Sequence, residues 1–115
     1  MLTEKDYCDY DTCVALWSMG LIPHPYDNTD TDKVMAIISL YEAQKWLREE
    51  KNIIVDVRYG AQYYNVVLNH RITCGRHIVM DKNNRIADFI EYEKALSEGV
   101  KCAVKLLKEN ETIHR

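Results

Sequence analysis

The segment 39–59, SLYEAQKWLREEKNIIVDVRY, constrains the fold of this chain more than any other stretch. Ser39 and Glu42 have the spacing of a capping box, in which both side chains accept hydrogen bonds from free backbone N–H groups at a helix start. Apolar residues then recur with the spacing of one helix face, namely Leu40, Ala43 and Leu47. We therefore predict a helix that begins after Ser39, and we expect it to be the central packing element of the domain.

The residues after Lys51 change from a period of 3.6 to a period of 2, which is typical of a strand. One face of this predicted strand is apolar and consists of Ile53, Val55 and Val57. The other face is mixed and consists of Ile54, Asp56 and Arg58. The apolar face should belong to the core, so we expect the mixed face to meet whatever this protein contacts.

Weaker signals on either side of this segment complete the predicted fold. Asp9 or Asp11 can cap a short helix, Thr12–Met19, which Gly20 should end. The apolar side of this helix is expected to consist of Val14, Leu16 and Trp17. Further strands are predicted at Gln62–Asn69, His77–Met80 and Arg85–Phe89, and a last helix at Glu91–Glu109. Residues 1–115 should form a single α+β domain, with a three- or four-stranded antiparallel sheet packed on one face by two helices, plus a short N-terminal helix.

The predicted last helix has a glycine in its interior, Gly99, on or beside its apolar side. A glycine there costs about 1 kcal/mol relative to alanine. Close approach of another element would explain why a side chain is missing at this position.

The composition of the chain excludes several classes of function. The 115 residues carry a net charge of -3, whereas a nucleic-acid-binding protein usually has a surplus of positive charge. The N-terminal sequence is acidic and polar, unlike a signal peptide, and no apolar run approaches the roughly 20 residues that span a bilayer. We therefore expect a cytoplasmic protein with no membrane partner, whose four cysteines are reduced.

A resemblance is carried by two segments, EAQKWLREEKNIIVDV at 42–57 and YEKALSEGVKCAVKLL at 92–107. Both segments resemble small proteins of gut Bacteroidota and of their phages and mobile elements. Those proteins combine a KWLRE helix that runs into a strand with a final helix of YEEAL type. Residues 10–21, YDTCVALWSMGL, are loosely similar to a short helix ending in glycine near their N-terminus. The resemblance implies an accessory protein of phage or mobile-element type, and it assigns no activity to any residue.

Cysteine and histidine residues raise the alternatives of a zinc site and a thiol site. Cys8 and Cys13 form one close pair and Cys74 and His77 another, as in structural zinc sites. Cys74 and His77 could also act as nucleophile and base, with Asp81 orienting the histidine. Unrelated thiols explain the same residues, so we predict no metal, no cofactor and no catalytic residue.

Arginine and tyrosine side chains suggest a ligand site on the predicted sheet. Arginine binds phosphate, and tyrosine stacks on nucleic-acid bases. If such residues converge at one end of the sheet, they form a surface for a nucleotide or a single strand. The residues predicted for it are Arg58, Tyr63, Arg71, Arg76 and His77. The alternative interpretation is an ordinary solvated end of a hairpin.

These observations leave three hypotheses of function. The leading one is a non-enzymatic accessory protein that binds another protein, with a homodimer as a further expectation because the mixed sheet face needs partial cover. The second is a protein that binds a nucleotide or nucleic acid through the arginine and tyrosine residues. The third is a small thiol-dependent or zinc-dependent enzyme.

Overall fold

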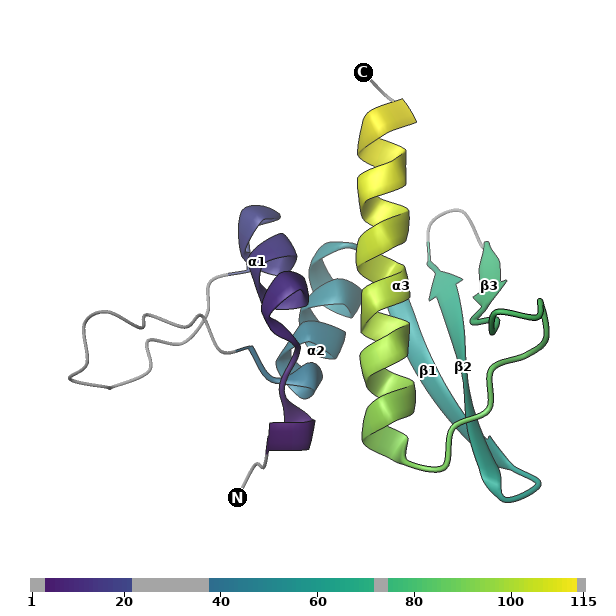
Figure 1. Ribbon diagram of the computed structural model, residues 1–115. Helices are drawn as coiled ribbons and strands as arrows, with labels where there is room; N and C mark the ends of the chain where they lie inside the picture. Colours follow the sequence, from purple (N-terminus) through teal and green to yellow (C-terminus); the bar gives the residue numbers. More distant parts are fainter. Residues whose placement is uncertain (1–3, 22–37, 72–74, 114–115) are drawn as a thin grey trace.

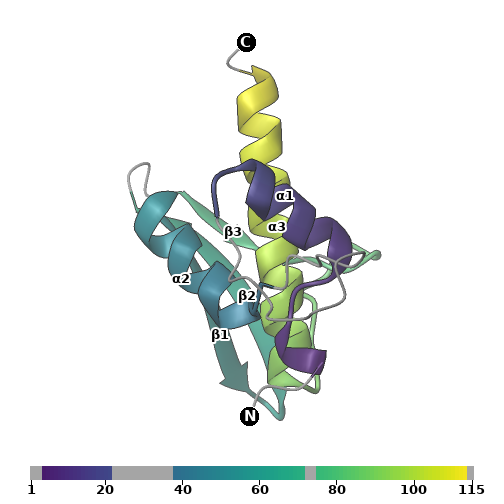
Figure 2. The same cartoon turned by 90° about the vertical axis from the view of Figure 1, so that its left-hand side faces the viewer.

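The computed structural model describes residues 4–21, 38–71 and 75–113 of the chain. Its elements in chain order are η1 (Glu4–Asp6), α1 (Tyr10–Ser18), α2 (Leu40–Glu50), β1 (Ile53–Gly60), β2 (Tyr63–His70), β3 (Arg76–Ile78) and α3 (Tyr92–Ile113). In this part of the chain the strands form an antiparallel sheet in the order β1-β2-β3. All three α-helices lie on one face of the sheet (Figure 1 and Figure 2). The predicted α+β class, with helices on the sheet and a short N-terminal helix, is confirmed.

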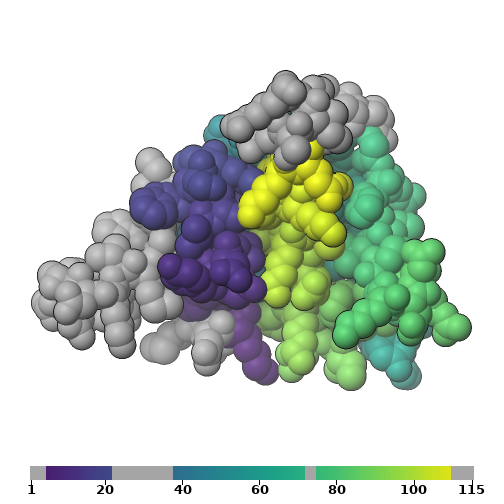
Figure 3. Space-filling model, turned by 45° about the horizontal axis from the view of Figure 1, so that its top comes forward, coloured from purple at the N-terminus to yellow at the C-terminus, as the bar shows by residue number. Residues whose placement is uncertain are grey.

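The last helix, α3, is the central packing element of the domain. It contacts β1 and β2 on one side, α2 and α1 on the other, and η1 near its start. Figure 3 shows α3 between α1 and the strands. The main contacts of α2 are with β1 and α3 alone, so the expectation that α2 is the centre was wrong. The length of α3 explains the difference, because only this helix extends across the whole sheet and beyond it.

Gly99 is the point at which α3 lies closest to the sheet. A Cβ atom on this residue would lie 2.6 Å from Cγ1 of Val55 on β1 and 2.6 Å from Cγ1 of Val66 on β2. Carbon atoms normally approach to about 3.5–4.0 Å. The predicted reason for the glycine, close approach of another element, is therefore confirmed.

The helix and strand of segment 39–59 form as predicted. Ser39 caps α2, and its hydroxyl accepts a hydrogen bond from the backbone N–H of Glu42 at 3.1 Å. In β1, Ile53 and Val55 are buried, whereas Arg58 is exposed. The inner face of the sheet is therefore the one that carries the apolar residues of β1, as the period-2 pattern indicated.

A two-residue turn joins β1 to β2. Gly60 pairs with Tyr63, so Ala61 and Gln62 form the turn, with φ angles of 52° and 73°. Positive φ at both central residues is the type I′ geometry, whose twist matches that of the flanking strands. Asparagine and glycine adopt this conformation more easily than alanine and glutamine. The turn is therefore strained at two positions.

The short helix α1 begins and ends close to the predicted bounds. The Asp9 carboxylate accepts a hydrogen bond from the backbone N–H of Thr12 at 2.8 Å. At the other end Gly20 has a φ of 112°, and the N–H of Leu21 donates to the carbonyl of Leu16 at 3.1 Å. This bond between residues five apart is the Schellman ending that the glycine predicted.

The predicted fourth strand, Arg85–Phe89, does not form as a strand. Two isolated bridges replace it, one between Met80 and Ile86 and one between Tyr64 and Phe89. Phe89 exchanges two backbone hydrogen bonds of 2.8 Å with Tyr64, which brings the chain to the start of α3. Among the described residues, no helix is long and apolar enough to cross a membrane.

Candidate functional site

The five residues predicted to bind a ligand do not form one site. Arg58 lies on β1 near the hairpin, and Tyr63 is the first residue of β2. Arg71 follows the other end of β2, and Arg76 pairs with Asn69 at that same end. Tyr63 and Asn69 are six positions apart along the strand, which corresponds to about 20 Å. The structure brings Arg71, Arg76 and His77 to one end of the sheet and places Arg58 and Tyr63 away from them.

The faces of the sheet separate these side chains further. His77 pairs with Leu68 and therefore belongs to the inner face, whereas the neighbouring Arg76 belongs to the outer face. On the outer face of β1, Nε of Arg58 donates to Oδ2 of Asp56 at 2.8 Å. Arg58, Tyr63 and Arg76 belong to the outer face but lie at opposite ends of it, and His77 belongs to the inner face. The ligand-binding role of these five residues therefore stays a prediction.

The thiols of Cys8 and Cys13 lie next to each other in the core. The Cys13 thiol donates to the carbonyl of Cys8 at 3.5 Å, and the Cys8 thiol to the carbonyl of Ser39 at 3.9 Å. Burial above all, and then the neighbouring Cys13 and Asp9, raise the pKa of Cys8 to about 12. Burial also raises the pKa of Cys13. The thiolate is the nucleophilic form, so at neutral pH these two residues are unreactive core groups.

A zinc site does not form from the described members of the predicted set. Cys8 and Cys13 are next to Ile38 and Ser39, whereas His77 lies on β3 at the edge of the sheet. Cys74 lies outside the described residues. Within residues 4–21, 38–71 and 75–113, no group of three or more metal-ligating side chains could hold an ion.

The outer face of α1 carries large apolar side chains that remain exposed. Tyr10 is 69% exposed, Val14 40% and Trp17 59%. These residues stand at i, i+4 and i+7, so they form one stripe along the helix. The buried residues of α1 are on the opposite side and comprise Thr12, Cys13, Ala15 and Leu16. We call Tyr10, Val14 and Trp17 the α1 stripe.

The α1 stripe was missed by the sequence interpretation, which placed Val14 and Trp17 on the packed side with Leu16. At 100° per residue, Leu16 lies about 160° from Val14 and about 100° from Trp17 around the helix axis, so the three residues do not share one face. That spacing shows that apolar residues occupy most sides of α1, with Asp11 and Ser18 on a narrow polar flank. The spacing therefore indicates that Val14 and Trp17 lie on a different side of α1 from Leu16. It does not indicate which side packs against α3.

Tyrosine side chains gather at the hairpin end of the molecule. The rings of Tyr59 and Tyr64 are 4.9 Å apart between centroids, and those of Tyr64 and Tyr92 are 5.7 Å apart and meet edge to face. Nearby, the Tyr41 hydroxyl donates to Oδ1 of Asp6 at 2.9 Å, and this bond is the main reason that the pKa of Tyr41 rises to about 12. The ring contacts join the hairpin to α3, and the hydrogen bond of Tyr41 joins α2 to η1.

Comparisons with known proteins give no further information about the site, so its geometry is the basis for its interpretation. Neither a family model, nor a curated protein, nor a solved structure matches this chain.

Proposed function

We propose that the protein is a non-enzymatic accessory protein that binds another protein through the α1 stripe. The observation that carries this proposal is the exposure of three large side chains, Tyr10, Val14 and Trp17, at i, i+4 and i+7 on one short helix. Anchors with this spacing are how an amphipathic helix binds an apolar groove. Tryptophan and tyrosine are also the residues that most often dominate the energy of an interface.

The partner that fits this helix has a concave apolar groove. With nine residues, α1 is about 13.5 Å long and about 10 Å wide. Two such helices laid flat on each other would bury a few hundred Å², well below the roughly 1,200 Å² of a stable interface. A groove reaches the flanks of the helix as well as the stripe. The area therefore favours a different protein over a second copy of this chain.

Charge at the start of α1 adds to the description of the partner. Asp11 is exposed in the first turn, and Asp9 is half exposed while its carboxylate pairs with Lys101 at 3.2 Å. Complementary charge steers association and favours the correct partner. Lys101, Lys105 and Lys108 line the same hollow as these two carboxylates, so this end of α1 presents mixed charge to a partner.

The accessory role is also supported by the resemblance of two segments to small proteins of gut Bacteroidota, their phages and mobile elements. A cytoplasmic location belongs to the same proposal. A nucleotide-binding role has no common surface among Arg58, Tyr63 and His77, so we do not propose it.

Site-specific photocrosslinking tests the proposal. A photoreactive phenylalanine analogue replaces Tyr10 or Trp17 in cells that express the protein, and Arg85, exposed in the turn after β3, is the matched control position. We expect the same partner to crosslink from both α1 positions and not from Arg85. With the purified partner, Trp17→Ala should weaken binding by about 2 kcal/mol, or roughly thirtyfold.

Three outcomes would contradict the proposal. One is the absence of adducts from α1, and another is the same adducts from Arg85. The third is an adduct with twice the mass of the chain, which would assign the stripe to a homodimer. Circular dichroism of Trp17→Ala has to show an unchanged fold, and Trp17 is exposed, so little loss of stability is expected.

A further inference from the structure

The strand β1 is one edge of the sheet in the described part of the chain. The other edge strand, β3, has three residues, whereas β1 has eight. Its pairing with β2 runs from Ile53 to Gly60 without a bulge. Natural proteins protect edge strands with prolines, lysines, bulges or a short length. Because β1 has none of these features, a further strand can pair with it.

The direction of the backbone groups shows which residues of β1 face this edge. The carbonyl of Asn52 accepts a hydrogen bond from the N–H of Arg71 at 2.8 Å. Even-numbered residues of β1 therefore direct their N–H and C=O groups toward β2, and odd-numbered residues direct theirs outward. The carbonyl of Val55 agrees, because it accepts from Nε2 of Gln44 on α2 at 2.8 Å. Toward the hairpin, β1 extends past the N-terminal end of α2 (Figure 2).

We propose that β1 pairs antiparallel with β1 of a second copy of this chain, around a two-fold axis at Val57. In this register the Val57 residues of the two copies form a hydrogen-bonded pair, and Val55 of each copy forms another with Tyr59 of the other. A carbonyl oxygen has two lone pairs, so the bond from Gln44 to Val55 does not prevent this pairing. The two three-stranded sheets then join into one continuous antiparallel sheet.

Charge selects this register. Asp56 and Arg58 share the outer face of β1, and within one chain Nε of Arg58 donates to Oδ2 of Asp56 at 2.8 Å. With the axis at Val57, Asp56 of each copy stands directly opposite Arg58 of the other, and a guanidinium has enough N–H donors for both carboxylates. An axis one residue earlier would place Asp56 opposite itself, and an axis one residue later would do the same to Arg58. Like charges directly opposite are destabilising, so β1 is self-complementary in one register only.

The same register covers an exposed aromatic side chain. Tyr59 is 66% exposed on the inner face of the sheet, although its ring contacts that of Tyr64. The proposed pairing places Tyr59 next to Val55 of the second copy, the residue that α2 contacts through Gln44. Burial of this ring adds a hydrophobic contribution to the ladder of hydrogen bonds. The α1 stripe lies on the other side of α3 from the strands, so this dimer leaves the stripe exposed (Figure 3).

Sedimentation velocity over a series of protein concentrations tests the dimer, for which we expect a Kd in the micromolar range. Asp56→Arg and Arg58→Asp each place like charges opposite one another, so each should weaken dimerisation about tenfold or more. The double variant, which exchanges the two charges, restores the unlike pairs and should dimerise like the wild type. The two single variants should form a heterodimer when they are mixed. Arg76→Asp changes the charge by the same amount as Arg58→Asp on the exposed outer face of β3, and should leave the Kd unchanged.

Hydrogen exchange of the wild-type protein, followed by NMR, tests the register without any substitution. The amides of Val57 and Tyr59 should become protected as the concentration rises, whereas those of Asp56 and Arg58 should be protected throughout by β2. Circular dichroism checks that each variant is folded.

Three results would overturn the proposal. One is a wild-type protein that stays monomeric at about 1 mM, far above a micromolar Kd. Another is a dimer that survives both charge reversals, or that Arg76→Asp weakens as much as Arg58→Asp does. The third is a dimer in which the amides of Val57 and Tyr59 gain no protection.

Discussion

Replacement of Gly99 by alanine should destabilise the protein even though alanine is the better helix former. The added Cβ would lie 2.6 Å from a methyl carbon of Val55 and 2.6 Å from one of Val66, about 1 Å short of normal contact. Valine is stiff about χ1, and the two side chains are 2% and 0% exposed, so neither can turn away. Either the valines or the whole helix must shift.

The magnitude follows from two opposing effects. Overpacking of a core costs about 1–3 kcal/mol, and the change from glycine to alanine within a helix gains about 1 kcal/mol. The net effect is about 0–2 kcal/mol, and it should lie toward the upper end because both valines are stiff and buried, so we expect Gly99→Ala to lower the free energy of unfolding by about 1–2 kcal/mol. Urea unfolding followed by circular dichroism at 222 nm measures this difference, provided that the m-value is unchanged.

Two further variants separate overpacking from helix propensity. Lys105 is exposed on the same helix, so the difference between Lys105→Ala and Lys105→Gly gives the propensity alone, about 1 kcal/mol in favour of alanine. Val66→Ala removes one of the two overlapping methyl groups, and in that background Gly99→Ala should cost about half as much. A gain in stability for Gly99→Ala in the wild-type background, like the gain at Lys105, would refute the close approach of α3.

Two other perturbations have a defined sign. Ala61→Asn combined with Gln62→Gly should stabilise the hairpin by about 1–2 kcal/mol, because the turn has positive φ at both residues. If thermal or urea unfolding shows no gain in stability, the result would contradict the type I′ turn. The pKa of Cys8 is raised from 9.0 to about 12, so the unfolded chain loses this proton before the native protein does. The free energy of unfolding should therefore fall between about pH 9 and pH 12, by up to about 1.4 kcal/mol per pH unit, and be unaffected by this group below pH 9. Cys8→Ala should flatten this decline when the free energy of unfolding is measured by urea titration at alkaline pH. Tyr41→Phe is the control, because the pKa of Tyr41 is also about 12. If the free energy of unfolding of Cys8→Ala declines with pH as steeply as that of the wild type, the result would count against the buried thiol.

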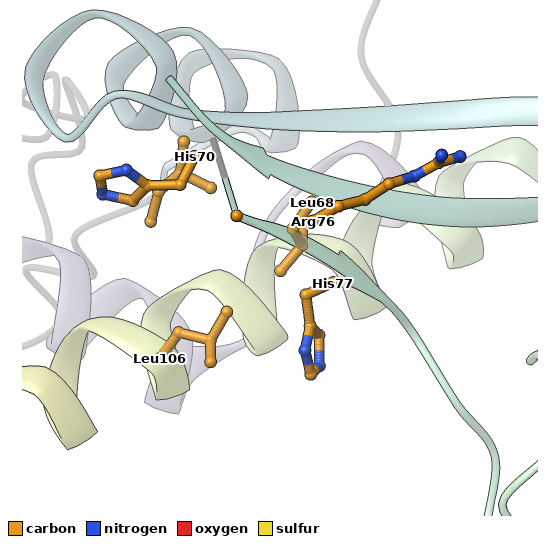
Figure 4. A pocket seen from close by; sticks show the side chains of 7 residues that line it. Leu68, His70, Arg76, His77 and Leu106 are labelled. Atoms are coloured by element: carbon orange, nitrogen blue, oxygen red, sulfur yellow. The ribbon is translucent and has the colours of Figure 1, made fainter. Parts of the chain in front are cut away.

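The candidate sites were less predictable than the fold. The residue types expected at a ligand site, arginine, tyrosine and histidine, were identified from the sequence, but Arg58 and Tyr63 lie apart from the others. A cavity of about 170 Å³ between the sheet and α3 is lined by His70 and Leu106, among others (Figure 4), and these two residues carry no shared motif. A cavity forms where distant elements leave space between them, and no local pattern records that space.

Local patterns determined the parts of this protein that neighbouring residues can form by themselves. The Ser39 cap, the change from helical to strand period and the Gly20 ending each depend on hydrogen bonds or side-chain spacing within a few residues. The glycine at position 99 even indicated a close contact before its partners were known.

Tertiary structure decided which surface of each helix and strand packs against another element. The α1 helix is apolar on most sides, and only the position of α3 decides that Leu16 is buried and Trp17 exposed. In β3, a shift of one residue would exchange the faces of Arg76 and His77, and the pairing with β2 is what fixes them. Both outcomes follow from contacts between residues far apart in the chain, and such contacts leave no period in the sequence.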